Sequence, residues 1–130
     1  MQMRRGFTLI ELLIVVVIVG ILAGIAIPKY SSVREKSYIV SVTSDLKSMA
    51  TQMEIYQAQN LVYPADIALL TDFTLSQGVN LTINEATGGQ GWAATGVHIG
   101  LPGAQCGFYY GNGSASNAVP ATIPGVVMCQ

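Results

Sequence analysis

The stretch RRGFTLIELLIVVVIVGILAGIAIPKY, residues 4–30, decides how the rest of the chain is organised. Residues 7–27 are all apolar or small, apart from Thr8 and the acid Glu11. A helix of about 20 such residues, at about 1.5 Å of rise each, is long enough to cross the hydrocarbon core of a bilayer. The segment therefore either spans a membrane or is removed while the chain crosses one.

A secretory signal peptide would share several of these features. Arg4 and Arg5 would be its basic start, and the tripeptide GIA, residues 24–26, would be its cleavage site. The apolar run is long for a signal peptide, however, Glu11 interrupts its beginning, and a helical pattern continues beyond Pro28. These three features favour a helix that remains in the mature protein.

A plain single-pass anchor would have no use for Glu11. On insertion scales an acid costs about 2.5 to 3.5 kcal/mol at the centre of a membrane helix, and less towards its edge. A cut between Gly6 and Phe7 would leave a free α-amino group on Phe7, four residues before Glu11. The amine of a neighbouring copy, shifted along the helix axis, would then lie beside this carboxylate, so that two charges are buried as a pair. Glu11 would thereby set the register between identical helices.

These first residues closely resemble the N-terminus of type IV pilins and of the pseudopilins of type II secretion. The family pattern is a basic leader that ends in glycine, then an aromatic residue and T-L-I-E-L, and here it reads RRGFTLIEL, residues 4–12. The resemblance covers about a quarter of the chain and is only general beyond Tyr30. It implies that a prepilin peptidase cuts after Gly6 and methylates the new amine of Phe7.

The pattern and the resemblance together predict three parts, namely a leader of residues 1–6, a helix of residues 7–59 and a head of residues 60–130. Residues 7–28 would be the transmembrane segment and filament core, and residues 29–59 an amphipathic spine. Apolar side chains recur along the spine at spacings of three and four, which predicts one buried face. This apolar stripe consists of Ile39, Val42, Leu46, Met49, Met53 and Tyr56.

Two glycines and a proline weaken the helix within its apolar half. Glycine costs about 1 kcal/mol relative to alanine, and proline about 3 kcal/mol. We therefore expect a bend or a locally melted turn between Gly20 and Pro28, and the resemblance implies that such a segment can lose helix in a packed filament. Gly20 and Gly24 also form a G-x-x-x-G pattern, which lets membrane helices approach closely, although glycine is in any case more common in such helices.

The remaining residues predict a small antiparallel sheet. Residues 79–83, 92–99 and 106–110 read as three short strands separated by glycine turns. Residues 64–70 predict a short helix with proline in its first turn, and residues 111–124 a surface loop. One face of the sheet would cover the apolar stripe, which gives an α+β fold with the hydrophobic half of a long helix protruding.

The chain has two cysteines, Cys106 and Cys129. In a domain exported across the membrane such a pair predicts one disulfide, which closes a loop of about 20 residues and contributes about 3 kcal/mol. Two unrelated buried thiols are the alternative. The basic leader also favours a cytoplasmic N-terminus, although three cations soon after the apolar run weaken that argument. A C-terminal loop closed by such a disulfide resembles the disulfide-bounded region of type IVa pilins.

Composition argues against several other classes of protein. Charged residues are only 10% of the chain and the hydrophobic share is 51%, which suits a subunit that is covered by its neighbours. A formal net charge of −1, with no Lys or Arg after Lys47, does not suit a nucleic-acid binder. The single histidine, His98, has no catalytic partners at a recognisable spacing, so a hydrogen-bonded or solvent-facing role in a strand is expected. The acids form no calcium loop, and we expect neither enzymatic activity nor a cofactor or metal.

These observations predict a structural subunit of a type IV pilus. The precursor would sit in the inner membrane as a single-pass protein, meet the prepilin peptidase and an assembly platform there, and then join an extracellular homopolymer. One alternative is the major pseudopilin of a type II secretion system, against which the cysteine pair and the missing calcium loop argue. A minor or competence pilin that binds DNA or a surface is the other alternative.

Overall fold

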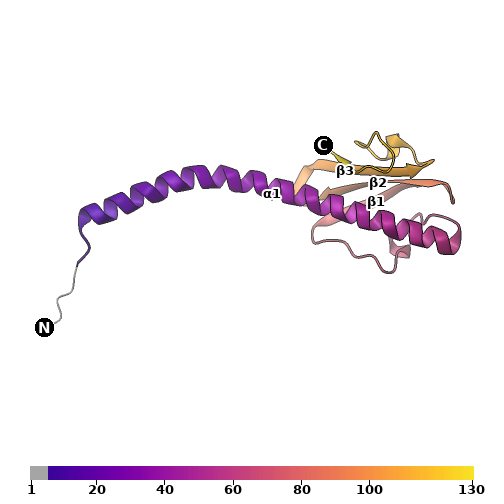
Figure 1. The fold of residues 1–130 in the computed structure, drawn as a ribbon, viewed down its shortest axis with the longest axis horizontal. Helices are drawn as coiled ribbons and strands as arrows, with labels where there is room; N and C mark the ends of the chain where they lie inside the picture. The colour runs from indigo at the N-terminus through magenta and orange to yellow at the C-terminus, as the bar shows by residue number, and fades with distance from the viewer. Residues whose placement is uncertain (1–5) are drawn as a thin grey trace. The chain divides into compact units, whose positions relative to one another are not determined.

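The structure is a computed structural model, and it describes residues 6–130 as one long helix and a small antiparallel sheet (Figure 1). Helix α1 runs from Leu9–Asn60. The chain forms two compact units, Met1–Arg34 and Glu35–Gln130, and α1 contributes to both. Most of the predicted leader, including Arg4 and Arg5, lies outside the described residues.

The apolar part of α1 is exposed. None of residues 7–27 is buried, and all of them except the half-buried Ala23 are exposed. By length and composition α1 contains a segment able to cross a membrane. The helix continues without interruption through Gly20, Gly24 and Pro28, so no locally melted turn occurs there. The bend, and the loss of helix in a packed filament, stay predictions.

The apolar stripe of α1 forms the helical side of the head's hydrophobic core, as the spacing predicts. Four of its members, Val42, Leu46, Met49 and Met53, are buried. The remaining two stripe residues are partly buried against the same core. The helix ends at the predicted place, because Asn60 donates its side-chain amide to the carbonyl of Tyr56 and Leu61 takes a left-handed φ of 63°.

The sheet has four antiparallel strands in the order β1-β2-β3-β4. The strands are β1 (Val79–Ala86), β2 (Gly91–His98), β3 (Leu101–Gly111) and β4 (Met128–Cys129). Figure 1 shows them packed along the C-terminal part of α1. The three predicted strands are present: β1 and β3 are longer than predicted, and β2 has the predicted length but begins one residue earlier. The fourth strand, β4, was missed. A strand of two residues has no alternation that a sequence pattern could reveal.

The prediction of a short helix over residues 64–70 was wrong in the type of helix and in the residue at which it begins. The chain forms only a single 3₁₀ turn, η1 (Ile67–Leu69), which Asp66 caps by accepting a hydrogen bond from the amide of Ala68 at 2.9 Å. Pro64 lies before this turn and is buried. Because the segment must turn back to bury Leu70 in the core, it has no room for a longer helix.

The prediction of a simple surface loop over residues 111–124 was also incomplete. This segment contains a second 3₁₀ turn, η2 (Ala115–Asn117), and buries Ala118 and Ala121 against Ala93 of β2. Neighbouring residues of a strand face opposite sides of the sheet. The loop therefore covers the face of β2 that points away from α1. A Cβ on Gly107 would collide with the carbonyl of Ala118, so this close approach requires glycine.

Candidate functional site

The residues predicted to take part in processing lie at the exposed start of α1. Gly6 is exposed, and no other heavy atom would lie within 4 Å of a Cβ placed on it. Phe7 is 81% exposed. Both residues that flank the predicted cleavage site are therefore exposed. Gly20 and Gly24, further along α1, are likewise exposed, with open space around their Cα atoms.

Thr8 and Glu11 close the first turn of α1 by three reciprocal hydrogen bonds. The backbone N–H of Thr8 donates to Oε2 of Glu11 at 2.8 Å, and the Thr8 hydroxyl donates to the same oxygen at 2.7 Å. The N–H of Glu11 donates to the Thr8 hydroxyl at 3.3 Å. This arrangement is a capping box, in which side chains satisfy amides that the helix itself cannot.

The sequence analysis missed the part that Thr8 plays, although the T-x-x-E pattern before an apolar run was visible. Oε2 of Glu11 is occupied within the chain, whereas Oε1 accepts no hydrogen bond from any described residue. Within a single chain, Thr8 thus holds the carboxylate in place, and one carboxylate oxygen stays free to bind a cation or a further hydrogen-bond donor. The geometry is compatible with the predicted pairing to an amine from another copy.

Replacing Thr8 with valine should weaken the first turn of α1. The substitution keeps the shape of the side chain but removes two of the three bonds, which costs about 1 kcal/mol for an N-terminal cap. Amide hydrogen exchange in detergent micelles should show faster exchange at residues 9–12. Serine at position 8 keeps the hydroxyl and should exchange like the wild type. Equal exchange rates in the valine variant and the wild type would contradict the capping role.

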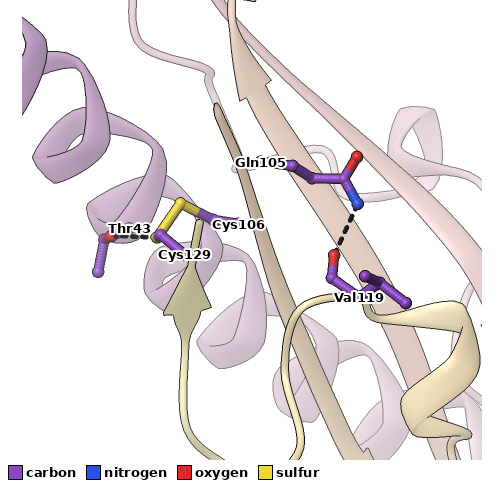
Figure 2. Close-up of a disulfide and its surroundings, with 5 residues drawn as sticks. All are labelled: Thr43, Gln105, Cys106, Val119 and Cys129. Carbon is purple, nitrogen blue, oxygen red and sulfur yellow. Dashed lines mark hydrogen bonds between the residues drawn. A yellow bond between two sulfur atoms is a disulfide. The ribbon is translucent and has the colours of Figure 1, made fainter. Parts of the chain in front are cut away.

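Cys106 and Cys129 form the predicted disulfide, which joins β3 to β4 (Figure 2). The sulfur atoms are 2.03 Å apart and the two residues are 23 positions apart in sequence. Cys129 Sγ also lies 3.5 Å from the hydroxyl of Thr43 on α1. Next to the disulfide, the side-chain amide of Gln105 donates a hydrogen bond to the backbone carbonyl of Val119 at 2.6 Å. The C-terminal segment is therefore fixed to β3 and contacts α1.

Glu85, near the end of β1, binds the loop of residues 111–124 to the sheet. Its Oε2 accepts hydrogen bonds from the side chain of Asn117 at 2.9 Å and from the backbone N–H of Ser114 at 2.8 Å. These two bonds, that from Asn117 first, hold the pKa of Glu85 below its usual value. The carboxylate stays ionised at neutral pH and is already engaged inside the chain.

Asp45 is a buried acid that the sequence analysis did not single out. Its side chain, only 6% exposed, accepts hydrogen bonds from the backbone N–H of Ser76 at 2.7 Å and from the Ser76 hydroxyl at 2.8 Å. This contact ties the loop before β1 to α1. The sequence did indicate that Asp45 is buried, because it lies three residues after Val42 and four before Met49 and therefore on the buried face of the helix.

Replacing Asp45 with alanine should lower the free energy of unfolding of the full chain in detergent by about 2 kcal/mol, because Ser76 would lose its partner in a partly buried site. Chemical denaturation followed by circular dichroism measures this change. Asp72 is an exposed acid in the turn after η1. Its alanine variant should stay within about 0.5 kcal/mol of the wild type. Equal losses in the two variants would contradict the role of Asp45.

His98 behaves as the sequence predicts for a hydrogen-bonded strand residue. Its ring stacks on Tyr38 with the centroids 4.0 Å apart, and Nδ1 accepts a hydrogen bond from the N–H of Gly100 at 2.9 Å. Nε2 lies 3.2 Å from the carbonyl of Gln77. Within residues 6–130, no three His, Cys, Asp or Glu side chains come together as metal ligands.

Known proteins resemble part of this chain. Residues 1–27 match the prokaryotic N-terminal methylation motif. The type II secretion system core protein G of Pseudomonas aeruginosa is 33% identical over 90 residues, which are 68% of this chain and 57% of that protein. Its namesake from Klebsiella pneumoniae is 39% identical over 64 residues, 49% of this chain and 46% of that protein.

A fimbrial protein is similar over a shorter stretch. The type IV major fimbrial protein FimA of Dichelobacter nodosus is 50% identical over 53 residues, 41% of this chain and 34% of that protein. The chain therefore spans 34% to 57% of the length of these three relatives.

Proposed function

Since this chain belongs to the family of type IV pilins and pseudopilins, we propose that it is the structural subunit of a type IV pilus filament. The exposed apolar surface of α1 carries this proposal. Residues 7–27 bury nothing within the chain, and so long an apolar surface must be covered by lipid or by other apolar helices. In the monomer the membrane would cover it, and in the filament the same segment of other copies would.

The proposal includes a route from the membrane to the cell surface. The precursor is a single-pass protein of the inner membrane, and a prepilin peptidase cuts after Gly6 and methylates Phe7. An assembly platform in the inner membrane then adds the subunit to an extracellular homopolymer. The open surroundings of Gly6 and the match of residues 1–27 to a methylation motif support the processing step. The role is structural, without catalysis.

The second candidate is the major pseudopilin of a type II secretion system. The similarity to core protein G favours it, because that similarity reaches 68% of this chain, against 41% for the fimbrial relative. The disulfide between Cys106 and Cys129 favours the pilus. A minor or competence pilin that binds DNA is less well supported, since no Lys or Arg follows Lys47.

Electron microscopy of sheared cell surfaces, combined with mass spectrometry of the subunit, tests the proposal. Long extracellular fibres should contain this chain, beginning at a methylated Phe7, and deletion of the gene should remove them. Loss of enzyme secretion without loss of fibres would favour the pseudopilin instead. A mature chain that begins at Ile27 would contradict both candidates, because it would mark the apolar segment as a cleaved signal.

A further inference from the structure

The head has a cavity of about 350 Å³ between α1 and the end of β3. Its lining includes Thr51, Glu54, Trp92, Phe108, Tyr110 and Gly125. Phe108 and Tyr110 of its lining lie just beyond the part of β3 that pairs with β4. The pairing of β4 with β3 stops at Gly107, and the next contact along β3 is the hydrogen bond from the N–H of Gly125 to the carbonyl of Tyr109 at 2.8 Å.

The chemistry of this cavity suits a cation. Three aromatic side chains form part of its wall, and Glu54 contributes a carboxylate. Oε1 of Glu54 accepts a hydrogen bond from the hydroxyl of Tyr63 at 2.9 Å, while Oε2 accepts none from the described residues. Burial, followed by the bond to Glu54, raises the pKa of Tyr63 to about 12, so the phenol remains a donor at neutral pH. A carboxylate beside aromatic rings favours an ammonium or guanidinium group.

The wall of the cavity also contains an unpartnered donor. Trp92 is fully buried, and its Nε1–H has no hydrogen-bond partner among residues 6–130. Buried donors are rarely left unpaired, because they lose their hydrogen bond to water without replacing it. This nitrogen is itself buried, so a side chain that enters the cavity does not reach it. The free oxygen of Glu54 is therefore the group of the cavity that can take a partner from another chain.

The other acids of the head are less suited to bind a cation. Glu85 is engaged by the C-terminal loop and Asp66 caps η1. Asp72, which is exposed like Glu54, lies outside this cavity and is not beside its aromatic wall.

The cations of the described chain are separated from these acids. They all lie on α1 between Lys29 and Lys47, and no Lys or Arg occurs beyond that point. Lys36 is an exposed lysine of the unit that contains the cavity. It precedes Glu54 by 18 residues on the same helix, or about 27 Å, and so cannot reach it within one chain. The basic part of one copy is complementary in charge to the acidic head of another.

We propose that the cavity around Glu54 receives Lys36 of a neighbouring copy in the assembled filament. This inference rests on the proposed function, because the filament is what brings a second copy to the cavity. The lysine's ammonium group pairs with the free oxygen of Glu54, and its alkyl chain packs against the half-exposed ring of Tyr110. Lys47 is a poorer candidate, since it lines a separate cavity with Val40, Thr43 and Ser44.

Zero-length carbodiimide cross-linking of native filaments tests the pair directly. Mass spectrometry should find a peptide in which Glu54 is joined to Lys36, and the distance of about 27 Å within one chain makes that link intermolecular. The Glu54→Gln variant should lose this peptide and keep links at other acids. Filaments in which Glu54 forms no link to Lys36 would overturn the inference alone. A wild-type chain that forms no filament would overturn the proposed function, and the inference with it.

Charge reversal provides a second, independent test. Glu54→Lys should lower the yield of fibres by about tenfold or more, because like charges at an interface are strongly unfavourable. Lys36→Glu should do the same, and the double variant should restore the yield to within about threefold of the wild type. Asp72→Lys makes the same change of charge outside the cavity and should leave the yield unchanged. Failure of the double variant to recover, while both single variants still fold by circular dichroism, would overturn the pairing.

Discussion

Replacing Glu11 with alanine is expected to abolish filaments while leaving membrane insertion and cleavage after Gly6 intact. The variant would leave the amine of Phe7 of a neighbouring copy without its carboxylate, and breaking a buried ion pair by removing one partner costs about 3 to 5 kcal/mol. That loss recurs at every subunit contact. Fibre yield in sheared fractions measures assembly, and the mass of the subunit in the membrane fraction measures processing.

Glutamine at position 11 separates the helix cap, which the structure shows, from the predicted pairing with an amine of another copy. Glutamine can still accept the hydrogen bonds of the capping box from Thr8, but it carries no charge. If pairing with an amine drives assembly, Glu11→Gln should fail like Glu11→Ala. Assembly by the glutamine variant would show that the helix cap, and not the charge, is what the filament requires. Normal fibres from the alanine variant would contradict both roles.

Removing the disulfide should produce the largest loss of stability in the head. Replacing both Cys106 and Cys129 with serine frees a loop that spans 23 positions, and it should lower the free energy of unfolding by about 3 kcal/mol. For a domain of this size, the expected fall in melting temperature is about 12 to 20 °C. Thermal unfolding of the full chain in detergent, followed by circular dichroism, measures it.

A matched control distinguishes the covalent bond from its surroundings. Thr43→Val removes the hydroxyl that contacts Cys129 Sγ but leaves the disulfide in place. This variant should lose less than about 1 kcal/mol, since only one weak contact is removed. A double serine variant that melts at the wild-type temperature would show that pairing of β3 with β4 does not depend on the disulfide.

The parts of the fold that sequence predicts are those in which each residue repeats a local pattern. The stripe from Val42 to Met53 follows the helical period, and the strands carry alternating side chains between glycine turns. Strand β4 has two residues, and it is defined by its pairing with Cys106 and Gly107 of β3. No local pattern encodes such an element, since its partner lies elsewhere in the chain.

In the candidate site too, the features with a local sequence pattern could be predicted, and those that depend on distant residues could not. The motif around Phe7 and Glu11 is contiguous, so the sequence reveals it, and even the missed role of Thr8 has a local signature. The cavity beside Glu54 depends on where β4 ends and on which rings of separate strands meet. Residues that are distant in sequence contribute to it, so only a three-dimensional structure can reveal it.

The distribution of charge in the head has a consequence for how whole fibres behave in suspension. Beyond Lys47 the chain carries four acids and no Lys or Arg. Fibres that display such heads would be polyanions, and they would repel one another at low ionic strength. At about 0.15 M salt this repulsion extends only about 8 Å, so individual fibres would approach and aggregate laterally as salt or divalent cations are added.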